Sequence, residues 1–382
     1  MLRKNILHIC NNFYGTDAYT NIFKEIRNQS IDSYIIIFMP NAAKNDPQYL
    51  KKKDCFKENA YIIWENIFFH KILKFLPIIR FYRIKKLVCL LNERHKFNLV
   101  HSHTLYSNGS IGHLISKFLN IPHIVTVRNV DVNEVFKYLF ILKKKLQKIL
   151  VDATSIVFLN PAYMKKSIGI FDDNSDILNK SNVIPSAVDD FWFENLGIKK
   201  EFPKALEVLY VGEISPNKNI EFCLNLFINE WDNQNFIVNI IGGTKSKKEN
   251  IQYLNYLKKK YNSYENINFI GEIDSKNKLL KYYRKSTIFF MASLKETFGL
   301  VYFEAMSQGT PVIFTEGQGI DGYFPPGFIG YPVNSSDLND AKKKVDLILK
   351  NYEVISSNCI DSSQTISNVA IISDWIKLYD RS

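Results

Sequence analysis

The chain has 382 residues, of which 46% are hydrophobic and 14% aromatic, so it can form the cores of two domains. It carries 49 basic and 38 acidic residues, and a net charge of +11 does not by itself identify a partner. No run of about 18 apolar residues occurs, and the five cysteines are scattered, so the sequence predicts neither a transmembrane helix, nor a disulfide framework, nor a zinc site. The cysteine pattern therefore indicates a protein of the reducing cytoplasm.

The beginning of the chain predicts a parallel sheet. Asn5–Cys10 and Ser33–Met39 are apolar runs typical of buried strands, and Ala18–Ile26 between them can form an amphipathic helix. A strand, helix and strand in this order are the start of a parallel α/β array. Gly15 follows the first strand, where it would let a ligand approach the backbone, although a plain turn explains this glycine equally well.

A basic and aromatic segment follows between residues 71 and 96. The segment carries one acidic residue, Glu93. Its composition allows two interpretations. One is a helical surface that lies on anionic lipid. The other is a pair of core-packing helices with solvated basic residues, interrupted at Pro77. The eight basic residues are Lys71, Lys74, Arg80, Arg83, Lys85, Lys86, Arg94 and Lys96.

Polar side chains follow two predicted strands in the first half of the chain. The strand at 97–102 leads into His103, and the strand His123–Val127 is followed by Arg128 and Asp131. Ligands of open α/β sheets gather at the carboxyl ends of strands, so these residues are candidates for binding an acceptor or lining a cleft. A histidine at such a place is explained equally well by packing against a neighbouring helix.

The second half of the chain repeats the pattern. Glu207–Gly212 is a predicted strand, Asn219–Glu230 a helix and Phe236–Ile241 the next strand. Two successive arrays of this kind predict an α/β chain with two Rossmann-like, doubly wound domains. The polar and aromatic stretch Asp190–Pro203 is the predicted linker.

The most specific stretch is Lys295–Ile313, which predicts a loop, a helix and a strand. Glu296 and Glu304 stand eight positions apart, and if the helix begins near Phe298 the two carboxylates share one side of it. Both could then reach one polar ligand. The helix start beside Gly299 would also offer backbone amides to an anion.

This stretch resembles the signature of glycosyltransferase family 4, an E-x-F-G-L-x-x-x-E-A-M-x-x-G-x-P-V-I run with a Glu-x7-Glu pair. The resemblance implies that Glu304 binds the ribose of a nucleotide sugar and that Glu296 binds the donor sugar. It also implies that backbone amides between them hold the diphosphate and that Lys218, in a loop similar to V-G-R-x-x-x-x-K-G, neutralises it. The other donor-binding residues implied by the resemblance are Gly212, Glu272, Ile273, Gly299, Leu300 and Val301.

The sequence departs from the family pattern at two positions. Glu213 stands where the family usually has arginine, which removes one expected phosphate ligand. Arg128 stands where many members have histidine, and arginine could hold an acidic sugar or a phosphate bidentately. We therefore expect catalytic roles for Glu296, Lys218 and Arg128, and roles in acceptor binding or in lining the cleft for Gly15, His103 and Asp131.

The resemblance implies a GT-B fold, in which two domains face a cleft and a C-terminal helix crosses back to the first domain. We expect an acceptor-binding domain over 1–190, a nucleotide-sugar-binding domain over 204–365 and the returning helix over 366–382. The implied activity is retaining transfer of a hexose, without a metal ion or cofactor, to a saccharide acceptor in cell-surface polysaccharide biosynthesis. We expect this acceptor to be lipid-linked. Such an enzyme would be cytoplasmic and could lie against the anionic inner leaflet of the membrane.

Two other functions are compatible with the same residues. A GT-B sugar-nucleotide epimerase would release sugar without an acceptor, and a catalytically degenerate partner subunit would bind the nucleotide without turnover. Nucleic-acid binding is not expected, because no recognition module accompanies the positive charge.

Overall fold

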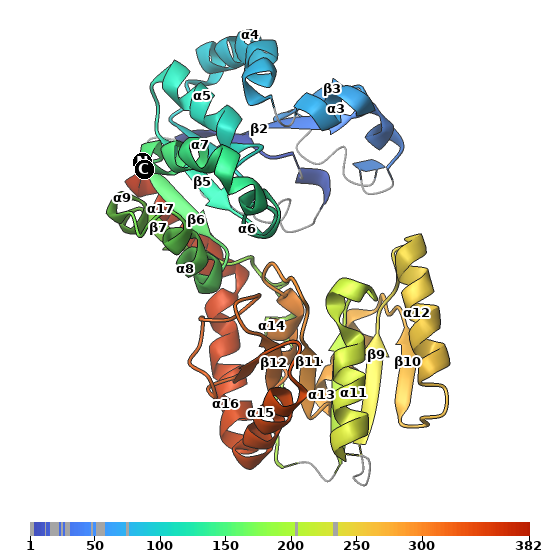
Figure 1. Cartoon of the computed structure of the whole chain (residues 1–382). Helices are drawn as coiled ribbons and strands as arrows, with labels where there is room; N and C mark the ends of the chain where they lie inside the picture. The colour runs from blue at the N-terminus through green and yellow to red at the C-terminus, as the bar shows by residue number, and fades with distance from the viewer. Residues whose placement is uncertain are drawn as a thin grey trace. The chain divides into compact units, whose positions relative to one another are not determined.

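The computed structural model of the chain forms two compact units, shown in Figure 1. Unit 1 comprises Met1–Leu159, Tyr163–Pro185 and Ile371–Ser382, and unit 2 comprises Asn160–Ala162 and Ser186–Ala370. The last helix of the chain therefore belongs largely to the first unit. The structure describes residues 4–11, 13–15, 23, 26, 31–46, 49–50, 58–73, 76–202, 205–231 and 236–382.

Unit 1 is built on a parallel sheet of seven strands in the order β3-β2-β1-β4-β5-β6-β7. Its central strands are covered on both faces, which explains why they read as nearly continuous apolar runs. The strands are β1 (Lys4–Ile9), β2 (Ile31–Pro40), β3 (Ala60–Glu65), β4 (Leu99–Ser102), β5 (His123–Val127), β6 (Ser155–Phe158) and β7 (Ser181–Val183).

The longest helix of unit 1 among the described residues is α4, which begins with Pro77 in its first turn and ends at Lys96 in a left-handed conformation. Ile84, Val88 and Leu91 of α4 pack into the core. No helix in the described part of the chain is long and apolar enough to cross a bilayer. The helices are α3 (Ile67–Leu73), α4 (Pro77–His95), α5 (Gly109–Leu119), α6 (Asn129–Asn133), α7 (Leu139–Asp152), α8 (Pro161–Ile170), α9 (Ser175–Asn179) and α17 (Asn368–Arg381).

Unit 2 has a parallel sheet of six strands in the order β10-β9-β8-β11-β12-β13, namely β8 (Leu206–Val211), β9 (Phe236–Ile241), β10 (Ile267–Gly271), β11 (Ile288–Met291), β12 (Val312–Thr315) and β13 (Gly330–Val333). Its helices are α10 (Phe191–Glu194), α11 (Ile220–Trp231), α12 (Lys248–Lys260), α13 (Lys276–Lys285), α14 (Leu300–Met306), α15 (Leu338–Lys350) and α16 (Tyr352–Ser363).

The predicted α/β fold with two doubly wound domains is confirmed, and most predicted strands are present within a residue or two. The sequence analysis missed β3 and β13, which are edge strands of the two sheets. β13 contains Gly330 and Pro332, which are poor strand formers. The predicted helix Ala18–Ile26 lies outside the described residues except for Phe23 and Ile26.

Each sheet has a topological switch point, where the strand order reverses. It lies between β1 and β4 in unit 1 and between β8 and β11 in unit 2. Because all strands are parallel, the loops that follow the two strands of a switch point begin side by side at one edge of the sheet. Those loops are the first place to look for a ligand site in each unit.

Candidate active site

The switch point of unit 2 brings Lys218 and Glu296 together. Lys218 ends the short 3-10 helix η4 (Pro216–Lys218) after β8, and Glu296 lies in the loop after β11. Lys218 Nζ donates a hydrogen bond of 2.5 Å to Glu296 Oε2, and the side chains are only 19% and 11% exposed. A partly buried pair of opposite charges therefore stands at the carboxyl edge of the sheet.

Two asparagines join the loops that carry this pair. Asn217 Nδ2 donates to the Lys295 carbonyl at 3.0 Å, and the Leu294 amide donates to the Asn217 carbonyl at 2.8 Å. Asn219 Nδ2 donates to the Ala292 carbonyl at 3.2 Å. These side-chain and backbone bonds fix the loop after β8 against the loop after β11, so Lys218 meets Glu296 in a defined geometry.

The glycine-rich loop after β12 holds Glu296 from a third side. The Glu296 amide donates to Gln318 Oε1 at 3.1 Å, and the Gly319 amide donates to the Glu296 carbonyl at 3.2 Å. Gly319 has a φ of +59°, and a Cβ atom there would lie 3.2 Å from Glu296 Cγ. A side chain at this position would be strained and would crowd the carboxylate.

Glu304 lies in a different environment. It stands on α14, and its Oε2 accepts a hydrogen bond of 2.9 Å from the hydroxyl of the buried Tyr283 on α13. Burial raises the pKa of Glu304 to about 7, although the Tyr283 hydrogen bond opposes this rise. The side chain is therefore poised to change its charge near neutral pH.

The two glutamates do not share a helix face in the way that the spacing argument required. Helix α14 begins at Leu300, and its N-cap Gly299 adopts a left-handed conformation with a φ of +78°, so Glu296 lies in the loop before the helix. The carboxylate of Glu296 contacts Lys218, whereas that of Glu304 contacts Tyr283. The N-cap and first turn of α14 lie between the two glutamates in the sequence, and they contain the predicted donor-binding residues Gly299, Leu300 and Val301.

The remaining predicted donor-binding residues follow the strands on the other side of the switch point. Gly212 comes directly after β8, and Glu272 and Ile273 come directly after β10 at the edge of the sheet. Gly242, after β9, approaches Gly212 so closely that a Cβ atom on it would lie 1.7 Å from the Gly212 carbonyl oxygen. Glycine is thus required where these two chain segments cross.

Two lysines that the sequence analysis missed compensate for the unusual Glu213. Glu213 Oε1 accepts hydrogen bonds from Lys247 Nζ at 2.9 Å and from Asn250 Nδ2 at 2.7 Å, and Lys245 Nζ lies 3.5 Å from Oε2. Burial opposes ionisation of Glu213, but these partners hold its pKa below the ordinary value. The loop after β9 thus brings positive charge to the place where arginine was expected.

In unit 1, Asp131 ties three backbone segments together. It is 1% exposed, and its carboxylate accepts hydrogen bonds from the amides of Leu105 at 2.9 Å, Tyr106 at 3.1 Å and Arg128 at 3.0 Å. Burial raises the pKa of Asp131, and these amides oppose the rise. Asp131 thus positions the loop after β4 and the start of α6, where Arg128 is the N-cap. The predicted ligand contacts of Arg128 and Asp131 stay predictions.

His103 and Gly15 both lie after strands of the switch point of unit 1. His103 belongs to a buried cluster in which His8 Nδ1 and His103 Nε2 are 3.0 Å apart. The nitrogens of the third member, His101, contact Tyr379 Oη and Thr126 Oγ1, each at 2.9 Å. The ligand atoms of the three histidines lie within 4.8 Å of one another, a spacing compatible with a metal ion. His8 Nδ1, His103 Nε2 and both ring nitrogens of His101 have contacts within the core, whereas His8 Nε2 has no hydrogen-bond partner among the described residues.

Residues 191–363 match the family model described as Glycosyl transferases group 1. This segment is therefore similar to the group 1 glycosyltransferases. It contains Lys218, Glu296, Glu304 and the two lysines beside Glu213. The residues predicted to bind the acceptor or to line the cleft, Gly15, His103 and Asp131, lie outside it in unit 1, as does Arg128.

Curated relatives and solved structures agree with this assignment. An uncharacterized glycosyltransferase of Methanocaldococcus jannaschii is 27% identical over 312 residues, which is 79% of each chain. The alpha-monoglucosyldiacylglycerol synthase of Streptococcus pneumoniae is 26% identical over 244 residues, 58% of this chain and 52% of that protein. An Anabaena HepE structure in complex with UDP and glucose matches with a TM-score of 0.69 at 14% identity, over 99% of this chain and 100% of that one. The chain has the GT-B fold, with units 1 and 2 as its two domains.

Proposed function

We propose that the chain is a retaining glycosyltransferase that transfers a hexose from a nucleotide-sugar donor to a saccharide acceptor without a divalent metal ion. The observation that carries this proposal is the Lys218–Glu296 pair, held by three loops at the switch point of a group 1 glycosyltransferase domain. Its position and its combination of a cation with a hydroxyl-binding carboxylate suit the diphosphate and sugar of such a donor.

Each residue of the site has a role in this reaction. Glu304 accepts hydrogen bonds from the ribose hydroxyls, and Glu296 accepts them from hydroxyls of the donor sugar. Lys218 keeps Glu296 oriented and places positive charge where the diphosphate leaves. Lys245 and Lys247 add to that charge in place of the expected arginine. A preorganised positive site lowers the barrier because negative charge develops on the departing diphosphate.

Retention follows from attack on the face that the leaving group occupies. The bond between the anomeric carbon and the diphosphate oxygen breaks as the acceptor oxygen forms its bond to the same carbon. A phosphate oxygen of the donor takes the acceptor proton, so the step needs no protein nucleophile. The protein contributes by holding donor and acceptor in position and by stabilising the leaving group.

Two similar proteins support a sugar-nucleotide donor and a lipid-linked acceptor. One relative is a glucosyldiacylglycerol synthase, and one structural neighbour was solved with UDP and glucose. We therefore place the enzyme at the cytoplasmic face of a membrane, where it extends a lipid-linked saccharide in the synthesis of cell-surface polysaccharide.

Substitution of the two glutamates tests the assigned roles. Glu304→Ala should weaken donor binding roughly tenfold or more, because a hydrogen bond to a charged group contributes about 1.5–3 kcal/mol. Glu296→Ala should mainly lower kcat, by about 10²-fold, because it removes contacts that position the donor sugar. Steady-state kinetics over a range of donor concentrations separates the two effects.

The matched control is Glu353→Ala, because Glu353 is a half-exposed carboxylate of the same unit, paired with Lys199. It should leave both constants unchanged. Wild-type kinetics in both site variants would contradict the assignment.

A further inference from the structure

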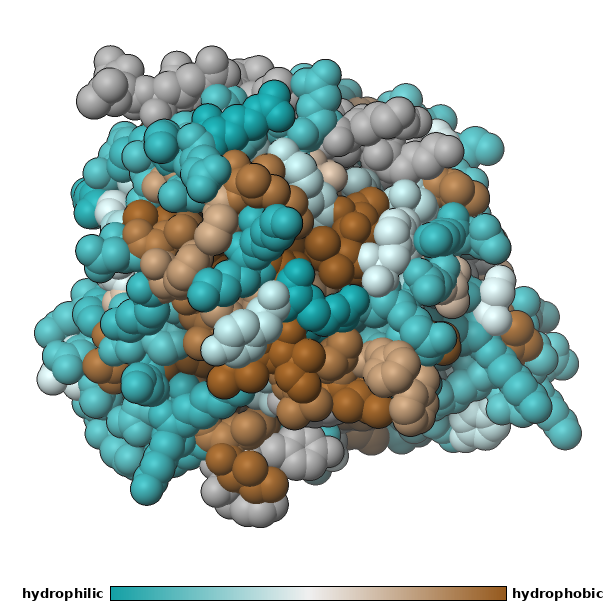
Figure 2. Space-filling view, turned by 90° about the horizontal axis from the view of Figure 1, so that it is seen from above, coloured by the Kyte–Doolittle hydropathy of each residue, from teal (hydrophilic) through white to brown (hydrophobic). Residues whose placement is uncertain are grey.

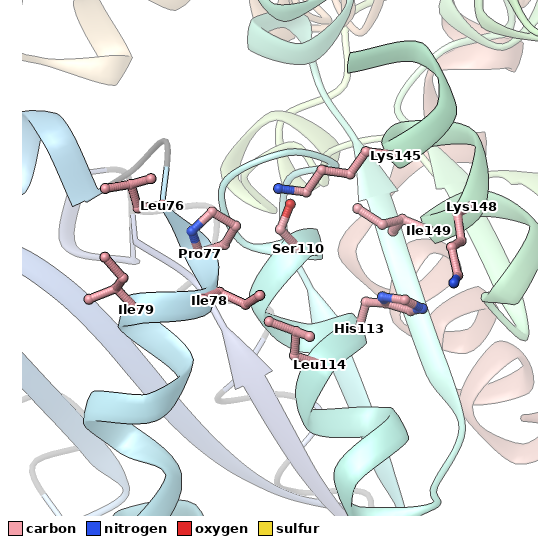
Figure 3. A pocket seen from close by; sticks show the side chains of 10 residues that line it. All are labelled: Leu76, Pro77, Ile78, Ile79, Ser110, His113, Leu114, Lys145, Lys148 and Ile149. Atoms are coloured by element: carbon pink, nitrogen blue, oxygen red, sulfur yellow. The ribbon is translucent and has the colours of Figure 1, made fainter. Parts of the chain in front are cut away.

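A cavity of about 430 Å³ lies in unit 1, between the starts of α4 and α5 and the second half of α7. Most of its lining is aliphatic, as the close-up in Figure 3 shows. A cavity of this size and composition suits an apolar chain better than a sugar, whose hydroxyls would need polar partners. The apolar lining residues are Leu76, Pro77, Ile78, Ile79, Leu114 and Ile149.

The cavity also has a small polar side. Ser110 is 3% exposed, and its hydroxyl has no hydrogen-bond partner among the described residues. Figure 3 shows this hydroxyl pointing into the space that Lys145 borders, with Lys148 further along α7. A buried hydroxyl without a partner is costly, so a ligand that supplies an acceptor beside the lysines would be favoured. An anionic group with an apolar tail meets both requirements.

The surface around the cavity is exposed and apolar. The exposed fractions are 51% for Ile67, 64% for Phe68 and 58% for Phe69 on α3, and 57% for Ile78 and 68% for Tyr82 on α4. Figure 2, which views the side of the molecule where α4 lies, shows apolar side chains gathered between hydrophilic ones. Such a concentration of large apolar side chains marks an interaction surface.

The charges around this surface are largely basic. Lys71, Lys86 and Lys144 are exposed, and Lys145 and Lys148 border the cavity. The nearest acid on α7, Asp152, is already paired with His113 at 2.8 Å and with Lys117 at 3.3 Å. Exposed aliphatic and aromatic side chains mixed with lysines match the chemistry of an anionic bilayer surface.

One basic residue of this segment points inward. Arg80 is 1% exposed and forms an ion pair of 2.5 Å with the buried Glu65 at the end of β3. Arg83 also contacts Glu65, at 2.7 Å. This buried pair anchors α4 to the sheet and so turns Ile78, Ile79 and Tyr82 outward. Helix α4 therefore packs on the core with one face, as the core-packing interpretation expects, and exposes an apolar and basic face, for which the lipid interpretation stays a prediction.

A short chain of contacts connects the cavity with the edge of the sheet. Lys145 Nζ lies 5.3 Å from the centre of the Tyr106 ring, and the Tyr106 amide donates to Asp131, which also binds the amide of Arg128. Lys145, which borders the cavity, thus contacts the loop after β4, and Asp131 joins that loop to Arg128 after β5. A lipid held there would have its head group near the end of the sheet where the acceptor is expected.

We propose that this face of unit 1 docks on an anionic phospholipid bilayer and that one lipid acyl chain enters the cavity, with the lipid phosphate against Ser110, Lys145 and Lys148. This inference rests on the proposed function, because it explains how the enzyme meets a lipid-linked acceptor. The exposed side chains of α3 and α4 insert among the head groups, and the lysines contact lipid phosphates.

Vesicle sedimentation tests the bilayer contact. The full chain should bind vesicles of phosphatidylglycerol and phosphatidylcholine in equal parts at least about tenfold more tightly than vesicles of phosphatidylcholine alone. Ile78→Glu should lower this binding about fivefold or more, because it places a carboxylate among anionic head groups. The control Val354→Glu makes the same change at a residue of unit 2 that is 64% exposed, and it should bind as the wild type does. No binding to anionic vesicles, or equal loss in both variants, overturns the proposal.

Soluble lipids test the cavity itself. Dihexanoyl phosphatidylglycerol, below its micelle concentration, should raise the melting temperature of the protein, whereas sn-glycerol 1-phosphate and dihexanoyl phosphatidylcholine should raise it much less. The double variant Lys145→Gln/Lys148→Gln should abolish the difference, and Lys258→Gln/Lys259→Gln on α12 should preserve it. An equal shift with glycerol phosphate would show a phosphate site without a chain, and no shift with any lipid would show that the cavity binds none; either result overturns the cavity assignment.

Donor binding, measured in the same samples, separates this inference from the proposed function. Loss of lipid binding with intact nucleotide-sugar binding overturns only the lipid inference. Lipid binding without nucleotide-sugar binding overturns the proposed function instead.

Discussion

At the scale of single residues, the two glutamates of the donor site have opposite electrostatic surroundings. Glu296 is paired with Lys218, whereas burial raises the pKa of Glu304 to about 7. In the proposed site, a Glu296 side chain held by Lys218 suits the orientation of the donor sugar. If Glu304 binds the ribose as we propose, its ionisation near neutral pH makes ribose binding sensitive to pH.

Donor binding should therefore strengthen as the pH rises from 6 to 8. The pKa of Glu304 is raised to about 7, so its carboxyl is mainly neutral below that pH and mainly ionised above it. The carboxylate accepts hydrogen bonds from ribose hydroxyls more strongly than the neutral carboxyl group does, so the donor affinity should rise through this window and then level off. Isothermal titration at several pH values measures it.

Glu304→Gln is the matched control, because it keeps the shape of the side chain and removes its titration. The variant should bind the donor weakly and without this pH dependence. An unchanged pH profile in Glu304→Gln would assign the titration to another group.

Most of the candidate donor residues could be predicted from the sequence, and their partners could not. Glu296, Glu304 and Lys218 lie in dense local patterns that identify them. Lys245 and Lys247 carry no such pattern, because they reach Glu213 only through the parallel pairing of β8 with β9. Side-chain partners across strands depend on tertiary structure, which a local motif does not contain.

At the scale of elements, buried histidines connect the central strands of unit 1 with the last helix of the chain. His8 on β1 contacts His103 after β4, and His101 on β4 contacts Tyr379 on α17. His123 on β5 accepts or donates a hydrogen bond of 2.9 Å with Ser102 Oγ. Burial lowers the pKa of His8 and His123 to about 3, and it lowers the pKa of His101 and His103 well below the ordinary value.

Unit 1 should therefore lose stability as the pH falls below about 6.5. In that window the unfolded chain binds protons at these histidines and the folded chain does not, so the free energy of unfolding falls with falling pH. Each such histidine accounts for about 1.4 kcal/mol per pH unit, until its folded-state pKa is reached. Hydrogen exchange of the β1 and β4 amides at pH 7.5 and 5.5 measures the effect in unit 1 alone.

A comparison variant identifies the groups responsible. His8→Gln keeps a polar side chain on β1 but cannot titrate, so it should reduce the loss of protection between the two pH values. Exchange protection that is independent of pH in the wild type would contradict the account of the histidine cluster.

At the scale of the whole molecule, the alternation of strands and helices was sufficient to predict two doubly wound units. It could not predict which face of α4 is exposed, because the direction of Arg80 depends on its buried partner Glu65 at the end of another element. The start of α14 was also placed too early. Gly299 delays the helix by adopting a left-handed conformation, which a helical spacing rule does not anticipate.

The most direct test of the central claim, that unit 2 binds a nucleotide sugar for transfer, is a donor panel. UDP-, GDP- and ADP-sugars are screened by thermal shift, because a true donor binds only the folded protein and raises its melting temperature. Consumption of the selected donor is then followed with and without a lipid-linked saccharide acceptor. We predict a clear shift with one class of donor and consumption that depends on acceptor. Acceptor-independent release of sugar would indicate an epimerase, binding without consumption would indicate a degenerate subunit, and no shift with any donor would contradict the site itself.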